Sequence, residues 1–175
     1  MDDAARNQAA FFPFPDLQGL PADLEAELEK RRHGHVFRML MHAPNTAAGF
    51  LAMTDAVRTK NSLPPELREL AILRVGRRYD APYEVHHHER IGRADGMTEA
   101  AVAAAASGPG ASGITEADRL ILELTDEILD RHGLSRASRA RALESLSVNQ
   151  LADLVLLVGH YQQVCNFLTT FEVQI

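Results

Sequence analysis

Apolar residues recur at helical spacing along almost the whole chain, and prolines, glycines or helix-capping residues separate each such stretch from the next. In the last stretch, Leu154, Val155 and Val158 begin an apolar stripe that reaches Leu168. No segment alternates between apolar and polar side chains as a half-buried β-strand would. The pattern therefore predicts an all-α fold of about eight or nine helices.

Local signals set the expected helix boundaries. The helices are expected at residues 22–32, 33–43, 45–60, 64–78, 82–94, 100–106, 116–132, 135–146 and from 148 onward. Thr98 is expected to cap one helix. Thr115 with Asp118, and Ser147 with Gln150, have the spacing of capping boxes for two others.

The first twenty residues have a different character. The run Phe11-Phe12-Pro13-Phe14-Pro15 cannot be helical, because each proline fixes its own φ and pushes the preceding residue toward extended backbone. Its phenylalanines are expected to pack on the same domain or on a neighbouring subunit. The predicted organisation is an extended Phe/Pro-rich arm over residues 1–20 and one helical domain over residues 21–175, which is a usual size for a domain.

Charge and cysteine content exclude several classes of function. The formal net charge of -6 and the absence of a basic stripe argue against a nucleic-acid partner. The single cysteine, Cys165, permits no intramolecular disulfide and no cysteine-based zinc cluster. Because the sequence has neither a signal-peptide pattern nor a long apolar run, we expect a cytoplasmic protein with no membrane partner.

Titratable side chains are densest in the predicted helix 82–94. Glu84 and His88 are four residues apart, so they lie on one helical face, where a carboxylate orients an imidazole and favours its protonated form. Such a pair suits a general acid or a proton relay, although many Glu–His pairs at this spacing are only surface contacts. His87 borders the same face, whereas His86 points away from it.

A metal site is an open alternative at this helix. Glu84, His87 and His88 offer oxygen and nitrogen ligands. Adjacent histidines on a helix diverge by about 100°, however, so further ligands from other helices would be needed. The sequence also lacks the His-Glu-x-x-His spacing of helical zinc sites. We therefore predict no bound metal.

A longer stretch around this helix, about residues 63–98, resembles a known family. The run from Leu63 to Arg77, LPPELRELAILRVGR, is followed by APYE at 81–84, His88, RIGRA at 90–94 and GMT at 96–98. This order resembles the core of the carboxymuconolactone decarboxylase family and of its AhpD-like alkylhydroperoxidase relatives. The last helix and the tail FEV at 171–173 resemble the longer, thiol-free members. The resemblance covers roughly residues 33–175 and implies an AhpD-like helical bundle.

The resemblance also assigns candidate site residues. AhpD-type members carry an upstream glutamate, a Cys-x-x-Cys pair and a histidine four residues after the second cysteine. Glu69 matches that glutamate and His88 that histidine, but Ala81 and Glu84 stand where the cysteines would be. Thiol peroxidase chemistry needs a thiolate and a resolving partner, which these positions cannot supply. Cys165 lies on an apolar stripe and is expected to be a buried core residue.

What remains is a proton-handling pocket. Its catalytic residues are predicted to be Glu69, Glu84 and His88, whose mutual interactions would push their pKa values apart and allow separate acid and base roles. The residues expected to line the pocket for substrate binding are Tyr83, His87, His160 and Tyr161. Structural roles for Glu69, His160 and Tyr161 stay open at this point.

The resemblance implies a cofactor-free lyase, most simply a decarboxylase, that acts on a small organic acid or lactone. In this reading His88 donates the proton, Glu84 positions it and Glu69 acts as a relay. The alternatives are a peroxide-defence oxidoreductase, which the missing cysteines weaken, a non-catalytic ligand-binding protein and a metal-dependent enzyme. Family members oligomerise, and the Phe-rich arm supplies apolar surface, so we expect a trimer, a hexamer or a dimer.

Overall fold

The computed structural model describes residues 11–175, and this part of the chain consists of nine helices without a strand. The helices are α2 (Ala22–Lys30), α3 (His35–Leu40), α4 (Pro44–Thr59), α5 (Pro65–Arg78), α6 (Pro82–Ala94), α7 (Glu99–Ser107), α8 (Glu116–Arg131), α9 (Arg136–Ala142) and α10 (Val148–Thr170). The predicted all-α fold is confirmed. None of these helices is long and apolar enough to cross a membrane.

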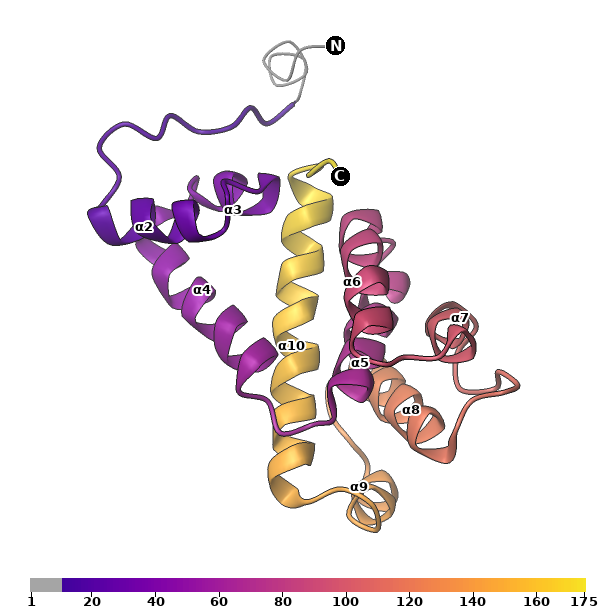
Figure 1. Ribbon diagram of the computed structural model, residues 1–175. Coiled ribbons are helices and arrows are strands. Elements are labelled where there is room, and N and C mark those ends of the chain that lie inside the picture. The colour runs from indigo at the N-terminus through magenta and orange to yellow at the C-terminus, as the bar shows by residue number, and fades with distance from the viewer. Residues whose placement is uncertain (1–10) are drawn as a thin grey trace.

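The core of the molecule is built around α5. This helix packs against α6, α7, α8 and α10, and its side chains from Leu70 to Val75 are buried all the way round. A helix that is covered on every side must be apolar on every side, and any polar side chain on it needs a partner. Figure 1 shows the long α10 between α4 on one side and the α5–α6 pair on the other.

Three helix starts follow the capping signals in the sequence. The Thr98 side chain accepts a hydrogen bond from the backbone N–H of Ala101. Thr115 with Asp118, and Ser147 with Gln150, form complete capping boxes. The predicted caps are therefore confirmed, as expected for contacts that span only three residues.

The boundary between the first two helices differs most from the prediction. Helix α2 ends at Lys30 and α3 covers only His35–Leu40, whereas continuous helices were expected over 22–32 and 33–43. Arg32 and His33 both have a positive φ, of 53° and 50°, which ends α2 and reverses the chain. Non-glycine residues adopt this conformation rarely, so the sequence pattern did not predict it.

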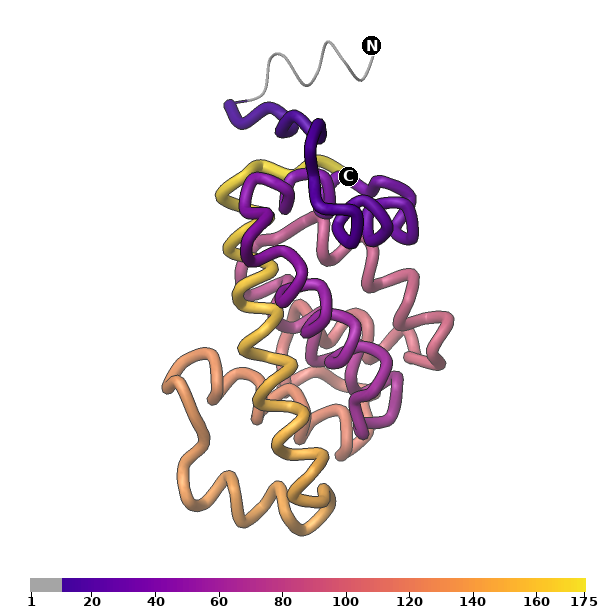
Figure 2. The backbone as a smooth tube through the Cα atoms, turned by 90° about the vertical axis from the view of Figure 1, so that its left-hand side faces the viewer, coloured from indigo at the N-terminus to yellow at the C-terminus, as the bar shows by residue number. Residues whose placement is uncertain are grey.

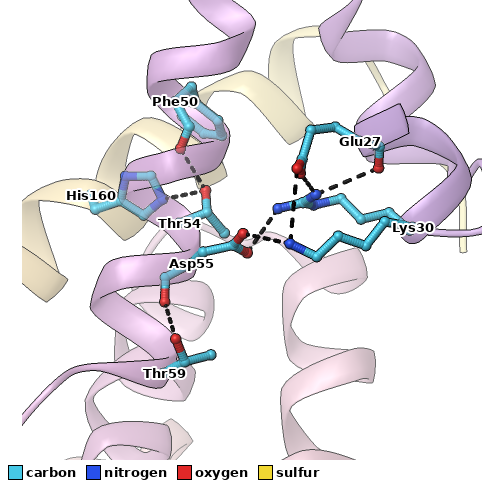
Figure 3. Close-up of polar contacts among 8 residues, drawn as sticks. Glu27, Lys30, Phe50, Thr54, Asp55, Thr59 and His160 are labelled. Carbon is cyan, nitrogen blue, oxygen red and sulfur yellow. Dashed lines mark hydrogen bonds and ion pairs between the residues drawn. The ribbon is translucent and has the colours of Figure 1, made fainter. Parts of the chain in front are cut away.

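Helices α2, α3 and α4 enclose a second, smaller apolar cluster. Its buried members are Leu24, Leu28, Leu40, Met41, Ala47 and Leu51. Ion pairs also join α2 to α4, because Lys30 and Arg31 both contact Asp55, at 3.1 and 2.7 Å (Figure 3). Figure 2 shows α4 alongside α10, so this N-terminal unit lies against the last helix.

The segment before α2 has no helix in residues 11–20. The Phe12 ring lies 4.9 Å from the Phe171 ring, and the Phe14 ring faces His35 and the guanidinium of Arg38. Two of the three phenylalanines thus pack on their own chain, while Phe11 is exposed. Residues 1–10 of the predicted arm lie outside the described residues.

Candidate active site

The site begins where α5 and α6 approach each other closely. Gly92 on α6 faces α5, and a Cβ placed on it would lie 3.4 Å from Cβ of Glu69 and overlap the Met97 sulfur. The missing side chain therefore leaves room for Met97 and lets α6 lie in contact with Glu69 on α5. The Glu69 carboxylate reaches toward α6 one turn before Gly92, where His88 is located.

His88 lies between two carboxylates. Its Nδ1 is 2.5 Å from Oε2 of Glu69, and its Nε2 is 2.8 Å from Oε1 of Glu84. All three residues are buried, with exposed fractions of 5% for His88, 1% for Glu69 and 6% for Glu84. The structure thus brings together the three residues that the sequence predicted as catalytic.

This arrangement determines the charge of the imidazole. Burial by itself would lower the pKa of His88, but the contacts with Glu69 and Glu84 outweigh it and raise the pKa to about 9. Burial raises the pKa of Glu69, and its hydrogen bond with His88 and the charges of His88 and Arg68 bring the net pKa below its ordinary value. At neutral pH the site therefore contains an imidazolium.

Two further side chains complete the polar network. The Tyr161 hydroxyl on α10 is 3.4 Å from His88 Nε2, and burial raises the pKa of Tyr161 well above its ordinary value. Arg68 donates from Nε to Oε1 of Glu69 at 3.2 Å and also pairs with Asp95. The Glu69 carboxylate is thus held from two sides, while Tyr161 stays a protonated phenol.

A cavity of about 430 Å³ opens beside this network. Among the predicted site residues, those that line it are Tyr83, Glu84, His87, His88 and Tyr161. Its other walls come from the turn after α2, from α3, from α4 and from the α10 residue Val164. A concave, mostly apolar space with a few convergent polar groups is the usual form of a small-molecule site.

Two predicted site residues do not line the cavity. Glu69 lies behind His88, on the side of the ring that faces α5. His160 is buried and contacts Thr54, whose Oγ1 lies 2.9 Å from His160 Nε2 (Figure 3). Because the Thr54 hydroxyl donates to the Phe50 carbonyl, His160 Nε2 must be the donor to Thr54. Burial lowers the pKa of His160, in keeping with a neutral ring.

Sequence reasoning missed the α4 contribution to the cavity. Phe50, Thr54 and Arg58 line it from one face of α4, since they follow one another at intervals of four residues. The signal in the sequence was an arginine on the same face as a phenylalanine.

The side chains that were candidate metal ligands make other contacts in the structure. In residues 11–175, no three side chains of His, Cys, Asp or Glu are placed so that they could hold a metal ion together. His88 has both ring nitrogens engaged by carboxylates. The His87 ring lies against the Tyr83 ring in a tilted arrangement, with 4.4 Å between the ring centroids, and His86 is exposed.

Comparison with known proteins gives one family match and several similar folds. Residues 44–127 match the carboxymuconolactone decarboxylase family. The sequence matches no curated protein. The fold is similar to an AhpD-core, peroxidase-related protein from Ralstonia eutropha, with a TM-score of 0.81 at 20% identity over 94% of this chain and 91% of that one.

Two other solved structures have a similar fold. A peroxidase-related protein from a Silicibacter species has a TM-score of 0.80 at 12% identity, over 94% of this chain and 91% of that one. A protein of unknown function from Agrobacterium tumefaciens has a TM-score of 0.69 at 17% identity, over 77% of this chain and 93% of that one. At these identities the likeness concerns the fold alone.

Proposed function

We propose that this chain, which matches the carboxymuconolactone decarboxylase family over residues 44–127 and has an AhpD-like fold, is a cofactor-free lyase acting on a small organic acid or lactone. The simplest reaction of this class is a decarboxylation followed by proton transfer to carbon. The observation that carries the proposal is the charged His88, held between two buried carboxylates at the wall of a cavity.

The reaction divides into two steps. First, the C–C bond to a carboxylate breaks, CO₂ leaves and the electron pair stays on the substrate as an enolate. Second, the carbon takes up a proton from His88 Nε2, which becomes neutral and is reprotonated from water. A pKa of about 9 keeps this proton in place at neutral pH, while a carbanion is basic enough to remove it.

Tyr161 has the properties needed to stabilise the enolate. With both nitrogens of His88 protonated, the Tyr161 oxygen can only accept from His88, so its own proton is free to point into the cavity. A neutral phenol that donates to a developing oxyanion stabilises the transition state more than the ground state.

The two glutamates have different parts in this scheme. Glu84 lines the cavity beside His88 and shares the proton that is transferred. Glu69 does not reach the cavity, so we assign it as a positioning residue that orients the ring through Nδ1 and keeps it charged. This assignment replaces the relay role that the resemblance implied for Glu69.

A thiol peroxidase function has less support. The only cysteine, Cys165, is completely buried in the main core, and burial raises its pKa above that of a free thiol. It does not line the cavity, and Ala81 and Glu84 occupy the positions of the redox pair. A buried protonated thiol is a poor nucleophile, so peroxide reduction would need a group other than this cysteine.

The test is turnover of a panel of lactone acids in D₂O, followed by NMR. The wild-type protein is expected to release CO₂ and to leave deuterium on the product carbon. His88→Gln is expected to lower kcat by roughly 10²- to 10⁴-fold with the fold intact, since it removes the proton donor. His86→Gln is the matched control, because His86 is exposed on the same helix and does not line the cavity.

The outcomes separate the competing functions. Undiminished turnover in His88→Gln would remove His88 from the mechanism. Binding of the acids without any turnover by the wild-type protein would indicate a non-catalytic binding protein.

A further inference from the structure

Arg58 has the most unusual environment of the charged side chains around the cavity. It lies on α4, its side chain lines the cavity, and its Nε atom is buried without a hydrogen-bond partner among residues 11–175. A buried polar atom without a partner is destabilising, and more so when the group is charged. An unpaired group of this kind at the wall of a cavity indicates that a molecule or ion bound in the cavity interacts with the guanidinium.

The acidic residue nearest to Arg58 on its own helix is already engaged. Asp55, three residues earlier, pairs with Lys30 and Arg31 from the α2 side (Figure 3). The hydrogen bonds from these two cations outweigh the effect of burial and lower the pKa of Asp55. Asp55 therefore stays ionised, with its two oxygens directed to α2 rather than to Arg58.

The cavity as a whole favours an anion. Arg32 and Arg90 line it together with Arg58, and Glu84 is its single acidic residue among those described. Arg31 also lines it, but the charge of Arg31 is offset by its ion pairs with Glu27 and Asp55. The charge of Glu84 is balanced by the imidazolium of His88. Positive side chains around a partly enclosed space concentrate anions in it.

The apolar part of the lining indicates which kind of anion fits the cavity. Phe37, Phe50, Ile91 and Val164 form an apolar surface next to Arg58. A planar guanidinium binds a carboxylate through two parallel N–H donors. The best fit is an organic acid with a small apolar body.

We propose that Arg58 binds a carboxylate of the substrate and thereby determines which acids enter the site. That the bound acid is a substrate rests on the proposed function. That Arg58 binds a carboxylate does not. The carboxylate is one that the reaction leaves in place. An ion pair to the departing group would stabilise the ground state more than the transition state, in which that group becomes neutral CO₂.

Calorimetric titration with benzoate tests the proposal, with benzamide as the uncharged analogue of the same shape. Arg58→Gln is expected to weaken benzoate binding at least about tenfold and to leave benzamide binding unchanged, because it removes a charge-assisted pair. Arg58→Lys is expected to recover part of the lost affinity, since lysine keeps the charge but lacks the paired N–H donors of the planar guanidinium. Arg136→Gln, an exposed arginine on α9, controls for net charge.

The results separate this inference from the proposed function. Equal benzoate affinity in wild type and Arg58→Gln, or no binding to the wild-type protein at millimolar benzoate, would overturn it. If binding depends on Arg58 but no acid is turned over, the lyase proposal fails while the carboxylate site stands.

Discussion

At the scale of single residues, the imidazole of His88 stays charged although it is buried. Desolvation favours a neutral imidazole, yet His88 has a carboxylate at each ring nitrogen, at 2.5 and 2.8 Å. The two carboxylates together outweigh the desolvation and make the charged form the stable one. The Arg68 guanidinium holds Glu69 in turn, so the orientation of His88 depends on a chain of contacts.

This charge predicts how stability depends on pH. The pKa of His88 is about 9 in the folded chain, above its ordinary value of 6.5, so its contribution is complete below about pH 6.5 and is lost as the pH rises through about 9. Between these values the folded state holds up to one more proton than the unfolded state. The free energy of unfolding should therefore fall by up to about 1.4 kcal/mol per pH unit.

Urea denaturation of the wild-type protein and of His88→Gln, from pH 6.5 to 9.5, measures this contribution. Groups that do not interact with His88 titrate alike in both proteins and cancel in the difference. Parallel stability profiles would show that His88 is neutral in the folded protein.

At the scale of helices, the Arg74 side chain links the buried helix α5 to its neighbours α7 and α8. Its Nε and one terminal nitrogen bind the two oxygens of Asp126 on α8, at 2.7 and 2.9 Å. The other nitrogen donates to the carbonyls of Ala105 and Ala106 at the end of α7, both at 3.1 Å. One side chain thus joins three helices and satisfies carbonyls that the end of α7 leaves open.

Replacing this side chain should destabilise the fold. Arg74→Met keeps the apolar stem but leaves two carbonyls and part of the Asp126 carboxylate unsatisfied, so we expect a loss of about 3–5 kcal/mol in the free energy of unfolding. Arg77→Met on the same helix is the control, because Arg77 is exposed and pairs with Glu89 on the surface. That change should cost less than about 1 kcal/mol. Similar urea midpoints for the two variants would contradict this view.

At the scale of the whole molecule, two apolar clusters meet at the cavity. The main cluster surrounds α5, the smaller one lies between α2, α3 and α4, and Phe50 and Phe167 pack against both. One wall of the cavity belongs to the smaller unit and the opposite wall, with His88, to the larger one. The shape of the site therefore depends on how the two units dock.

Loosening the smaller unit should affect the site without unfolding the rest. Leu28→Ala removes a buried side chain of that unit and should cost about 2–5 kcal/mol. Amide hydrogen exchange should accelerate in residues 22–41, and benzoate binding should weaken, while α5 and α8 keep their protection. Leu122→Ala in the main core is the matched control. Uniform acceleration in Leu28→Ala would mean that the two units unfold as one.

The expected homo-oligomer stays a prediction at this scale. Sedimentation would give its mass as a multiple of 19.3 kDa.

Local chemistry accounts for what the sequence predicted correctly. Helix caps span three residues and the Glu84–His88 pair spans four, so backbone geometry alone brings these groups together. The same reasoning failed for Val155, which continues an apolar stripe but is 42% exposed. A stripe shows which residues can be buried, while the neighbouring helices decide which of them are.

The sequence by itself therefore determined the all-α fold, the helix caps and the pairing within α6, and the family resemblance added Glu69. Only the tertiary structure decided the roles of the side chains that come from different helices. Docking of α5 on α6 put Glu69 behind His88, and docking of α4 on α10 put Arg58 at the cavity and His160 against Thr54. The physical reason is that helix periodicity specifies a face, whereas the packing of whole helices specifies what that face contacts.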